Sequence, residues 1–393
     1  MDPSLKILFV PRWYPSRCDP MPGLFIQRQA EALAEKHSVR VISVHADPDC
    51  KTTFEIQHSV ENAVKICRIF YKKDLRAPFV SKIVNLFRYV KAHHLGYQSL
   101  MPFSVDIVHG HILTREIFFA WYMSHKQKCP YVVSEHWSRY FAQNRTYRGV
   151  FRKWLTGFLT GRSSALILVS QSLKDAMKSC GLSHPATFIV PNVVDTSSFV
   201  VATSGRQSEK AVILHVSCFE DKSKNISGFL EAVAGLFRRR NDFRVVLAGE
   251  GPDLANLKIY AARLGLDPGR VEFAGLKQNT ELVNLYQSGS FLVQSSRYET
   301  FGTVVIEALA CGLPVVSTST GIAATLINAD TGILIQHSSV DEIVMAIEHM
   351  LNIYPTFEKQ KLHESAALMF SGSVIRGQLE GIYREIADTW QKV

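Results

Sequence analysis

The sequence predicts an α/β protein built from two doubly wound parallel-sheet domains that face each other across a cleft. Three observations predict this class. The chain has 393 residues, which is long enough for two domains of ordinary size. Short apolar runs of strand length alternate with helical patterns in both halves, as in parallel sheets with crossover helices. A polar stretch with one glycine, residues 201–210, separates the halves and is the predicted linker.

The first domain is predicted at residues 1–200 and opens with a strand, a long loop, a helix and a strand. These are expected at residues 6–10, 11–23, 25–36 and 39–44. The loop PRWYPSRCDPMPG is rich in proline and turn-forming residues and ends at Gly23. Ligands of open parallel sheets bind beyond the carboxyl ends of strands, so we expect this loop to line the cleft. Later elements of this half are predicted as strands 105–111, 131–134 and 165–170 and a helix at 173–180.

The second domain is predicted at residues 211–372, again as alternating strands and helices. Its strands are expected at residues 212–216, 244–248, 271–274, 291–293 and 313–318, and its helices at 226–239, 254–264, 281–288 and 302–310. A last helix, about residues 373–393, is expected to return to the first domain. The stretch GSFLVQSSRYETFGTVVIEALACGLPVVST, residues 289–318, is the most informative part of the chain.

Two carboxylates stand out in that stretch. Glu307 lies in a helix that is apolar on nearly all sides, and such a helix is buried. A buried carboxylate must be paired or hydrogen-bonded, either by a structural partner or by two neighbouring hydroxyls such as those of a ribose. Glu299 lies in the loop just before the helix, where free N–H groups and the helix dipole favour a phosphate. Both a structural and a ligand-binding role remain open from these residues alone.

Composition restricts the class of protein. The chain is 47% hydrophobic and 20% charged, which is typical of a globular protein. No apolar run approaches the roughly 20 residues that span a membrane, and the run 5–10 lacks the longer core of a signal peptide. Seven cysteines without a CxxC pair argue against a disulfide framework or structural zinc. We therefore expect a cytoplasmic protein.

The formal net charge of +9 admits nucleic acid, an anionic membrane or anionic substrates as partners. No nucleic-acid motif is present. Two basic amphipathic stretches, residues 72–94 and 145–162, favour either an anionic membrane surface or ordinary core-facing helices with a solvated face.

Other candidates for metal binding are weaker. Asp47 and Asp49 flank a proline after a strand, and we interpret them as a solvated loop rather than a metal site. His109 and His111 are two apart on a strand and so face the same way. With His136, which also follows a strand, they could hold zinc or simply pack at the strand end.

The pattern Glu299–Thr–Phe–Gly302 between strand and helix, followed by Glu307 in EALACGLPVV, closely resembles the signature of the retaining family 4 glycosyltransferases. The resemblance covers most of the chain and implies the GT-B fold of two Rossmann-like domains, the first on the acceptor side and the second binding a nucleotide sugar. It implies that Glu299 holds the donor sugar and Glu307 the ribose. The backbone at Phe301, Gly302 and Thr303 would contact sugar and diphosphate.

The same resemblance assigns further residues. It places His136 beside the donor sugar near the reacting carbon, and Lys224 on the donor diphosphate. Gly23 and Gly251 would let backbone approach the donor. Three departures stand out: Gly23 stands alone where the family often has two glycines, Cys218 takes the place of an arginine that Lys222 could replace, and no glutamate follows Gly321.

The resemblance implies a retaining glycosyltransferase that needs neither metal nor cofactor and moves a sugar from a UDP- or GDP-linked donor. The acceptor would be a glycan or lipid-linked, in cell-surface polysaccharide or lipopolysaccharide synthesis. The enzyme would lie in the cytoplasm or peripherally on the inner face of the membrane. Two alternatives stay open: a sugar-nucleotide epimerase or phosphorylase on the same scaffold, and a non-catalytic nucleotide-sugar binding protein.

Overall fold

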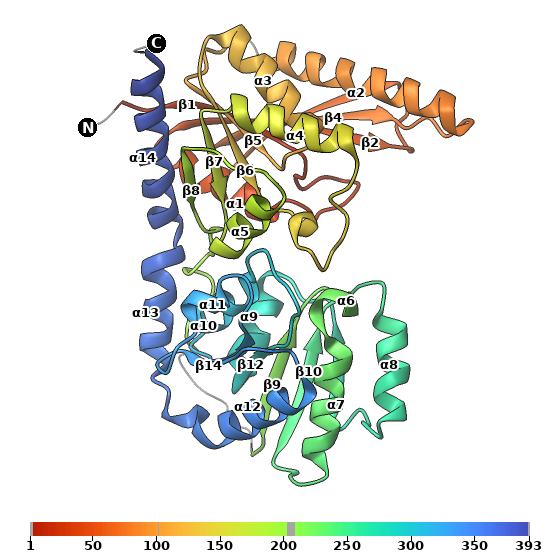
Figure 1. Cartoon of the computed structure of the whole chain (residues 1–393), viewed down its shortest axis with the longest axis vertical. Helices are drawn as coiled ribbons and strands as arrows, with labels where there is room; N and C mark the ends of the chain where they lie inside the picture. The colour runs from red at the N-terminus through yellow and green to blue at the C-terminus, as the bar shows by residue number, and fades with distance from the viewer. Residues whose placement is uncertain (1–2, 101, 203–208, 392–393) are drawn as a thin grey trace. The chain divides into compact units, whose positions relative to one another are not determined.

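The computed structural model describes residues 3–100, 102–202 and 209–391. The chain divides into two compact units (Figure 1). The N-terminal unit comprises Met1–Val169, Leu173–Val193 and Gly372–Val393, and the C-terminal unit comprises Ser170–Ser172 and Val194–Ser371. Most of the predicted linker, residues 203–208, lies outside the described residues.

The N-terminal unit contains a sheet of eight strands in the order β3-β4-β2-β1-β5-β6-β7-β8. The strands are β1 Lys6–Pro11, β2 Ser38–Asp47, β3 Phe54–Glu61, β4 Val64–Lys72, β5 Ile107–His111, β6 Tyr131–Glu135, β7 Ala165–Leu168 and β8 Thr187–Ile189. Neighbouring strands are parallel except β3 and β4, which form an antiparallel hairpin at the edge. The hairpin turns at Asn62 and Ala63, both with positive φ. Because of this hairpin the sheet is not wholly parallel. The sequence analysis did not predict it.

The interpretation of Asp47 as part of a solvated loop was wrong. Asp47 is the last residue of β2 and is buried. Its carboxylate accepts a hydrogen bond of 2.9 Å from Nε of Arg17, whose Nη2 lies 2.7 Å from it. The paired arginine explains how the carboxylate can be buried at a strand end.

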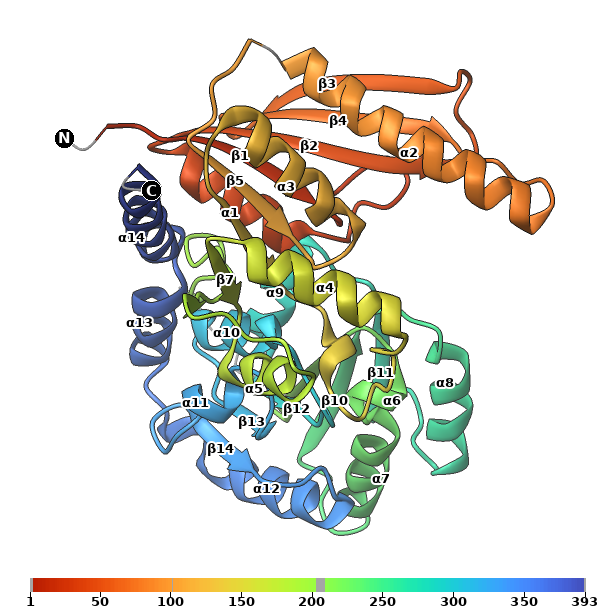
Figure 2. The ribbon, with the colours of Figure 1, turned by 45° about the horizontal axis from the view of Figure 1, so that its top comes forward.

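Helices cover the faces of this sheet. They are α1 Leu24–Ala34, α2 Pro78–Leu100, α3 Arg115–Gln127, α4 Val150–Arg162, most of α5 Gln171–Ser179, the short η1 Ser138–Tyr140 and the last helix α14 Gly372–Gln391. The sequence placed the start of a basic stretch at Lys72, but Lys72 ends β4 and the helix begins at Pro78. Figures 1 and 2 show α2 lying over β2 and β4, with its first turns extending beyond the strands.

The last helix belongs to the N-terminal unit, where it packs against α1. Its buried Tyr383 shares a hydrogen bond of 2.6 Å between its hydroxyl and Nδ1 of His109 on β5. Ile375, Leu379 and Ile382 of the same helix join the core of this unit. The chain therefore ends on the unit in which it begins.

The C-terminal unit has a wholly parallel sheet of six strands in the order β11-β10-β9-β12-β13-β14. Its strands are β9 Ala211–Val216, β10 Phe243–Ala248, β11 Val271–Gly275, β12 Phe291–Gln294, β13 Val315–Thr318 and β14 Gly332–Ile335. Its helices are α6 Asp221–Lys224, α7 Ile226–Phe237, α8 Leu254–Arg263, α9 Asn279–Ser288, α10 Thr303–Ala310, α11 Ala323–Leu326, α12 Val340–Ile353, η2 Tyr354–Thr356 and α13 Lys359–Phe370. The strands read as continuous apolar runs because helices bury both faces.

Strand order reverses at β9, the first strand of this unit, which lies between β10 and β12. In open parallel sheets such a reversal leaves a crevice at the carboxyl ends of the two central strands. The loops that follow β9 and β12 are therefore the expected location of a ligand site. They carry Lys224 and Glu299.

Candidate functional site

Lys224 and Glu299 meet at the carboxyl ends of β9 and β12. Lys224 is the last residue of α6, and Glu299 lies in the loop between β12 and α10. Nζ of Lys224 is 2.5 Å from Oε1 of Glu299, and the two side chains are only 20% and 11% exposed. A partly buried pair of this kind is screened less by solvent than one on the open surface.

All hydrogen bonds found on the Glu299 side chain reach the same oxygen. Nε2 of Gln294 donates to Oε1 over 3.1 Å and Oγ of Ser296 over 2.8 Å, in addition to Lys224. No described residue donates a hydrogen bond to Oε2. The carboxylate is thus fixed in orientation with one oxygen left for donors from a ligand, and hydroxyl groups are such donors.

Short polar side chains hold the two loops together. Oγ of Ser295 donates to the carbonyl of Lys224 over 3.0 Å, and the backbone N–H of Arg297 donates to the carbonyl of Ser223 over 2.7 Å. Oγ1 of Thr318 donates to the carbonyl of Ser296 over 2.6 Å. These supporting residues were missed by the sequence analysis. Their signal is that polar side chains directly follow or end apolar strands.

The loop after β12 leads into the first turn of α10. Gly302 precedes this helix with φ of 89°, a conformation that favours glycine, and no side chain of the described residues caps the helix. The amide groups of its first turn can therefore bind an anion. The side chain of Phe301 is buried, so this residue offers only its backbone to the site.

Gly321 shapes the same loop, although the sequence analysis gave it no role. A Cβ at this position would lie 2.3 Å from the carbonyl oxygen of Phe301 and 3.0 Å from Cβ of Glu299. The next residue, Ile322, donates its N–H to the same carbonyl over 2.7 Å. A larger residue at Gly321 would displace the loop that carries Glu299.

Glu307 is buried in α10 and has a structural partner. The hydroxyl of Tyr286, on α9, donates to Oε2 of Glu307 over 3.0 Å. Burial, with the Glu307 charge beside it, raises the pKa of Tyr286, so the hydroxyl keeps its proton as donor. The structure thus confirms that this carboxylate is hydrogen-bonded, while a ribose contact stays a prediction.

Glycines also shape the loop after β9. A Cβ at Gly251 would lie 2.6 Å from the backbone N and O of Phe219, so only glycine allows this approach. Cys218 and Lys222 are exposed in or next to this loop. A further cation lies here: Nη1 of Arg297 donates to the carbonyl of Asp221 over 2.6 Å. Arg297 was not considered from the sequence as a replacement for the arginine absent at Cys218.

In the N-terminal unit, His136 directly follows β6 and is buried. Burial lowers its pKa to about 3, against a smaller opposing effect of the neighbouring Asn192 side chain, so the ring is neutral. The adjacent Glu135 fixes the turn, because its carboxylate accepts N–H groups of Leu113, His136 and Trp137 at 2.7 to 2.9 Å. Glu135 was also missed by the sequence analysis.

His109 and His111 face the same way, as their spacing on a strand predicts. Their rings stack with centroids 3.9 Å apart, and the ring of His111 lies 5.8 Å from that of His136. Burial holds the pKa of both strand histidines well below the ordinary value. Within the described part of the chain, no group of three His, Cys, Asp or Glu side chains could hold a metal ion.

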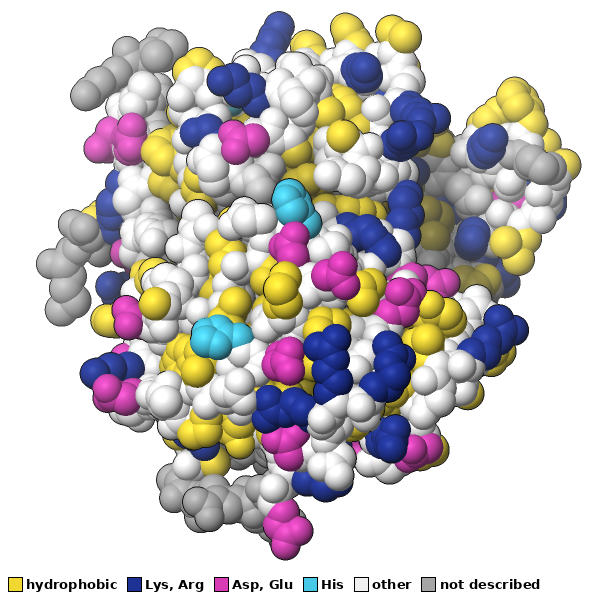
Figure 3. All heavy atoms as spheres, turned by 60° about the horizontal axis from the view of Figure 1, so that its bottom comes forward, with side chains coloured by type: hydrophobic (Ala, Val, Ile, Leu, Met, Phe, Trp, Pro, Cys, Tyr) yellow, Lys and Arg dark blue, Asp and Glu magenta, His cyan; other side chains and the backbone are white. Residues whose placement is uncertain are grey.

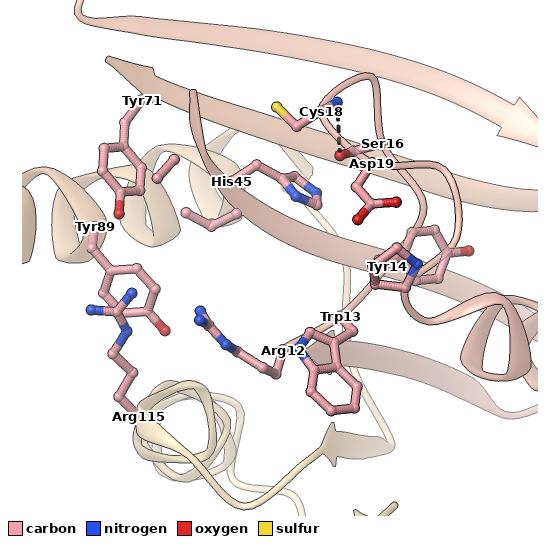
Figure 4. A pocket seen from close by; sticks show the side chains of 13 residues that line it. Arg12, Trp13, Tyr14, Ser16, Cys18, Asp19, His45, Tyr71, Tyr89 and Arg115 are labelled. Carbon is pink, nitrogen blue, oxygen red and sulfur yellow. Dashed lines mark hydrogen bonds between the residues drawn. The ribbon is translucent and has the colours of Figure 1, made fainter. Parts of the chain in front are cut away.

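Gly23 closes the long loop that follows β1. It precedes α1 with φ of 83°, and a Cβ there would lie 2.3 Å from the carbonyl oxygen of Trp13. Beside this loop, at the carboxyl ends of β1, β2 and β4, is a pocket of about 260 Å³. Figure 4 shows Arg12 and Arg115 on one side of it and Asp19 on the other.

The two α/β units, one with a wholly parallel and one with a mostly parallel sheet, fit the class of the GT-B glycosyltransferases, as does the Lys224–Glu299 pair at the strand ends. The model of the glycosyl transferases group 1 matches residues 199–367, and that of glycosyltransferase family 4 matches residues 23–198. The two matches are contiguous and together span residues 23–367, which make up most of both units. The chain belongs to the family 4 glycosyltransferases.

Relatives and solved structures agree with this assignment. The chain is 26% identical over 288 residues to an alpha-D-kanosaminyltransferase of Streptomyces kanamyceticus, covering 68% of this chain and 74% of the relative. It is also 26% identical over 219 residues to a phosphatidylinositol N-acetylglucosaminyltransferase chain of Arabidopsis thaliana, covering 56% of this chain and 48% of that protein.

Solved structures share the fold, among them two at 18% identity. Sucrose-phosphate synthase from Thermosynechococcus elongatus has a TM-score of 0.77 and covers 98% of this chain and 100% of its own. HepE of Anabaena, solved with UDP, has a TM-score of 0.70 and covers 97% and 100%. At this identity the likeness concerns the fold.

Proposed function

We propose that the chain is a retaining, metal-independent glycosyltransferase that uses a nucleotide sugar as donor. The observation that carries this proposal is the orientation of Glu299. Its Oε1 accepts hydrogen bonds from Lys224, Gln294 and Ser296, whereas its Oε2 has no donor among the described residues. Helix α10 begins four residues after Glu299. A fixed acceptor for sugar hydroxyls beside an anion-binding helix end suits a sugar diphosphate.

The remaining donor contacts follow from chemistry. Lys224 supplies the positive charge for the diphosphate and the first amides of α10 supply N–H donors. Glu307 accepts the ribose hydroxyls alongside its bond from Tyr286. Neutral His136 donates or accepts a hydrogen bond at the donor sugar without adding charge beside the phosphates. Together these groups can stabilise the leaving diphosphate where its charge develops.

The proposed reaction retains the configuration of the anomeric carbon, as the signature around Glu299 and Glu307 favours. The bond from this carbon to the diphosphate oxygen breaks, and a bond from the acceptor hydroxyl forms on the same face. The hydroxyl proton moves to the leaving phosphate oxygen. UDP or GDP is released. Lys224 and the helix end supply the positive charge that such a leaving group needs.

The acceptor is proposed to be a glycan or a lipid-linked molecule of cell-surface polysaccharide or lipopolysaccharide synthesis. The phosphatidylinositol relative has a lipid in its name, and a D-inositol 3-phosphate glycosyltransferase of Corynebacterium aurimucosum is 29% identical over 242 residues, covering 56% of this chain and of that protein. Both names contain a phosphorylated inositol. They support an acceptor that combines a sugar-like ring with a phosphate.

The start of α2 supports binding to an anionic membrane surface, proposed to be the inner face. Its apolar residues recur at helical spacing and point away from the sheet, with Phe79 76% and Phe87 67% exposed. This exposed apolar stripe consists of Phe79, Val80, Ile83, Leu86, Phe87 and Val90. On the lobe at the right of Figure 3, where Figure 1 places these turns, apolar and basic side chains adjoin.

Charge complementarity supports an anionic membrane as the proposed occupant of this stripe. Lys72, Lys73, Lys82, Arg88 and Lys91 lie on this helix or just before it in the sequence. The one carboxylate between them in the sequence, Asp74, pairs with Arg76 at 2.7 Å. A basic amphipathic helix of this kind lies in the interface of an anionic bilayer. On α4, Val150, Phe151 and Trp154 are exposed as well. Within the described chain, no helix combines the length and apolarity needed to cross a membrane.

A thermal-shift panel of UDP- and GDP-sugars, followed by mass spectrometry of products on lipid-linked and free glycans, tests the proposal. We expect one donor to stabilise the protein and its sugar to appear on an acceptor. Release of a sugar phosphate that depends on inorganic phosphate would indicate a phosphorylase, and conversion of the donor's own sugar an epimerase. Donor binding without turnover on any acceptor would favour a binding protein.

A further inference from the structure

The pocket beside the loop 11–23 lies wholly in the N-terminal unit and contains none of the residues assigned to the donor. Its walls come from this loop, from the ends of β2 and β4, from α2 and from the first residue of α3. In open parallel sheets this edge is where ligands bind. The chemistry of the walls therefore indicates what the pocket can hold.

One wall carries an excess of positive charge. Nη1 of Arg12 donates to Oε1 of Glu116 over 2.8 Å. The guanidinium of Arg115 lies 3.8 Å from the ring centroid of Tyr89, and its Nε is 3.8 Å from the same Glu116 oxygen. Two guanidinium groups thus share one buried carboxylate. Most of their N–H groups have no hydrogen bond to a described residue. The planar, forked guanidinium suits the paired oxygens of a phosphate or a carboxylate.

Tyr89 adds a neutral donor to this wall. Its hydroxyl is buried beside the carboxylate of Glu116, the same carboxylate that accepts from Arg12. Burial, with the Glu116 charge nearby, raises its pKa well above the ordinary value, so it stays protonated. Figure 4 shows the hydroxyl directed toward the guanidinium of Arg12.

The opposite wall carries a carboxylate and aromatic rings instead of guanidinium groups. Figure 4 shows Asp19 reaching in from this side, with Ser16 next to it. One oxygen of Asp19 accepts the N–H of Met21 over 3.0 Å, and a carboxylate can accept two or more further bonds. Trp13 and Tyr14 also line the pocket. Carboxylates and aromatic rings suit the hydroxyls and the C–H face of a sugar.

We propose that this pocket binds the acceptor through an anionic sugar, with a phosphate or carboxylate on Arg12 and Arg115 and ring hydroxyls on Asp19. This inference rests on the proposed transferase function, which supplies the need for an acceptor. The anionic group can belong to a free sugar or to a lipid headgroup. The second source is open because α2 carries both Tyr89 in the pocket and the exposed apolar stripe.

The test uses fluorine NMR on the full chain labelled with 5-fluorotryptophan, without any donor. All five tryptophans lie in the N-terminal unit, and Trp13 lines the pocket, so Trp13→Phe assigns its signal. The probes are glucose 1-phosphate, glucuronic acid and uncharged methyl glucoside. We expect the two anions to shift the Trp13 signal with affinities roughly tenfold or more above that of the glucoside, because bonds to a charged group are the stronger ones.

Three variants locate the effect. Arg115→Gln should abolish the preference for anions, and it is chosen because Arg115 is 45% exposed and its Nε lies as far as 3.8 Å from Glu116. Lys65→Gln removes the same charge at the opposite end of β4 and should keep the preference. Asp19→Asn should weaken the binding of glucose 1-phosphate and leave the binding of inorganic phosphate unchanged. Equal binding of charged and neutral sugars, a preference that survives Arg115→Gln, or no response to any probe would overturn the proposal.

Short-chain lipids separate the two sources. If the headgroup is the source, dihexanoyl phosphatidylinositol should bind more tightly than glucose 1-phosphate, while dihexanoyl phosphatidylcholine should not. If a free sugar is the source, the order of the first two is reversed. Because no donor is present, this result is independent of the donor site. Anion preference without sugar transfer would contradict the proposed function alone, and transfer without preference would contradict the pocket alone.

Discussion

Nζ of Lys224 lies 2.5 Å from Oε1 of Glu299, although 75 residues separate them in the chain. The pair joins the loop after β9 to the loop after β12 across the point where strand order reverses. Without a ligand each charge neutralises the other. In the proposed donor complex, the diphosphate would compete for Lys224 and sugar hydroxyls would replace it on Glu299, so that the pair would couple the two parts of a nucleotide sugar.

Replacing Lys224 by alanine should lower turnover about 100-fold or more, because the leaving diphosphate loses its nearest side-chain cation. Lys222→Ala removes an exposed charge two residues away and should keep most of the activity. Steady-state kinetics on both variants checks this. Near-normal turnover in Lys224→Ala would mean that the phosphates bind elsewhere or that Lys222 or Arg297 carries them.

An arginine at Cys218 should tighten donor binding. The thiol is exposed in the loop after β9, so the longer side chain has room and its fork suits phosphate oxygens. Titration of UDP and GDP into Cys218→Arg and Cys218→Ser measures the change. Equal affinities of the two variants would show that this position does not reach the diphosphate.

Glu307→Ala should weaken binding of the free nucleoside diphosphate and of the nucleotide sugar alike. A charge-assisted hydrogen bond contributes roughly 1.5–3 kcal/mol, or about tenfold or more in affinity. Tyr286→Phe is the matched control, since it removes the structural partner of Glu307 and leaves the carboxylate. If both variants lower stability and neither lowers diphosphate affinity in folded protein, Glu307 serves the fold and not the ribose.

Exchanging Phe79 and Phe87 for serine should abolish binding to vesicles of phosphatidylglycerol, because each exposed phenylalanine contributes up to about 1.5–3 kcal/mol on burial. Met345→Ser with Leu368→Ser removes comparable exposed apolar groups from the C-terminal unit as a control. Sedimentation with vesicles measures both. Binding should also fall as salt screens the basic side chains over about 8–10 Å. Equal binding to phosphatidylcholine, or none to either lipid, would contradict the membrane proposal.

His136 should make the N-terminal unit less stable in mild acid. Its pKa is near 3 in the folded chain, below the ordinary value of 6.5, so below about pH 6.5 the unfolded chain binds the proton first. Stability is complete above that pH and falls by about 1.4 kcal/mol per pH unit on the way down to about pH 3. Other buried histidines with lowered pKa, among them His45 and His93, add to the loss.

Denaturant unfolding followed by tryptophan fluorescence isolates this effect, because all five tryptophans lie in the N-terminal unit. Between about pH 7.5 and about pH 5, His136→Gln should lose about 2 kcal/mol less stability than the unaltered chain. His58→Gln, at an exposed position on β3, should lose as much as the unaltered chain. An unchanged pH dependence in His136→Gln would show that the ring is already charged or solvated when folded.

The parallel strands could be predicted because burial on both faces leaves continuous apolar runs, as in Phe291–Gln294 and Ala211–Val216. The hairpin partner Phe54–Glu61 was missed because an edge strand with exposed polar residues shows no such run. The start of α2 was misplaced because its apolar spacing continues from β4. The charged residues Lys72 and Lys73 do not mark the boundary between β4 and α2, whereas Pro78 is the first residue of the helix.

The site was predictable only in part. Glu299 and Glu307 lie on one continuous segment, where spacing and burial can be inferred together. Tyr286, on α9, contacts Glu307, and Gly321, after β13, lies against the loop of Glu299. Both come from outside this segment, and single residues carry no signal of such contacts. Lys224 came from a resemblance, and its bond to Glu299 depends on the pairing of β9 with β12. The local sequence pattern does not show which strands pair with each other.

The most direct test of the donor site is calorimetric titration of Glu299→Gln and Glu307→Ala, each with the free nucleoside diphosphate and with the nucleotide sugar found active, alongside turnover. Glu272→Gln, an exposed carboxylate on β11, is the control. We predict that Glu299→Gln loses most turnover without weaker diphosphate binding, since the diphosphate has no sugar to hold, and that Glu307→Ala weakens both ligands. Loss of diphosphate binding with intact sugar transfer in Glu299→Gln would contradict the assignment.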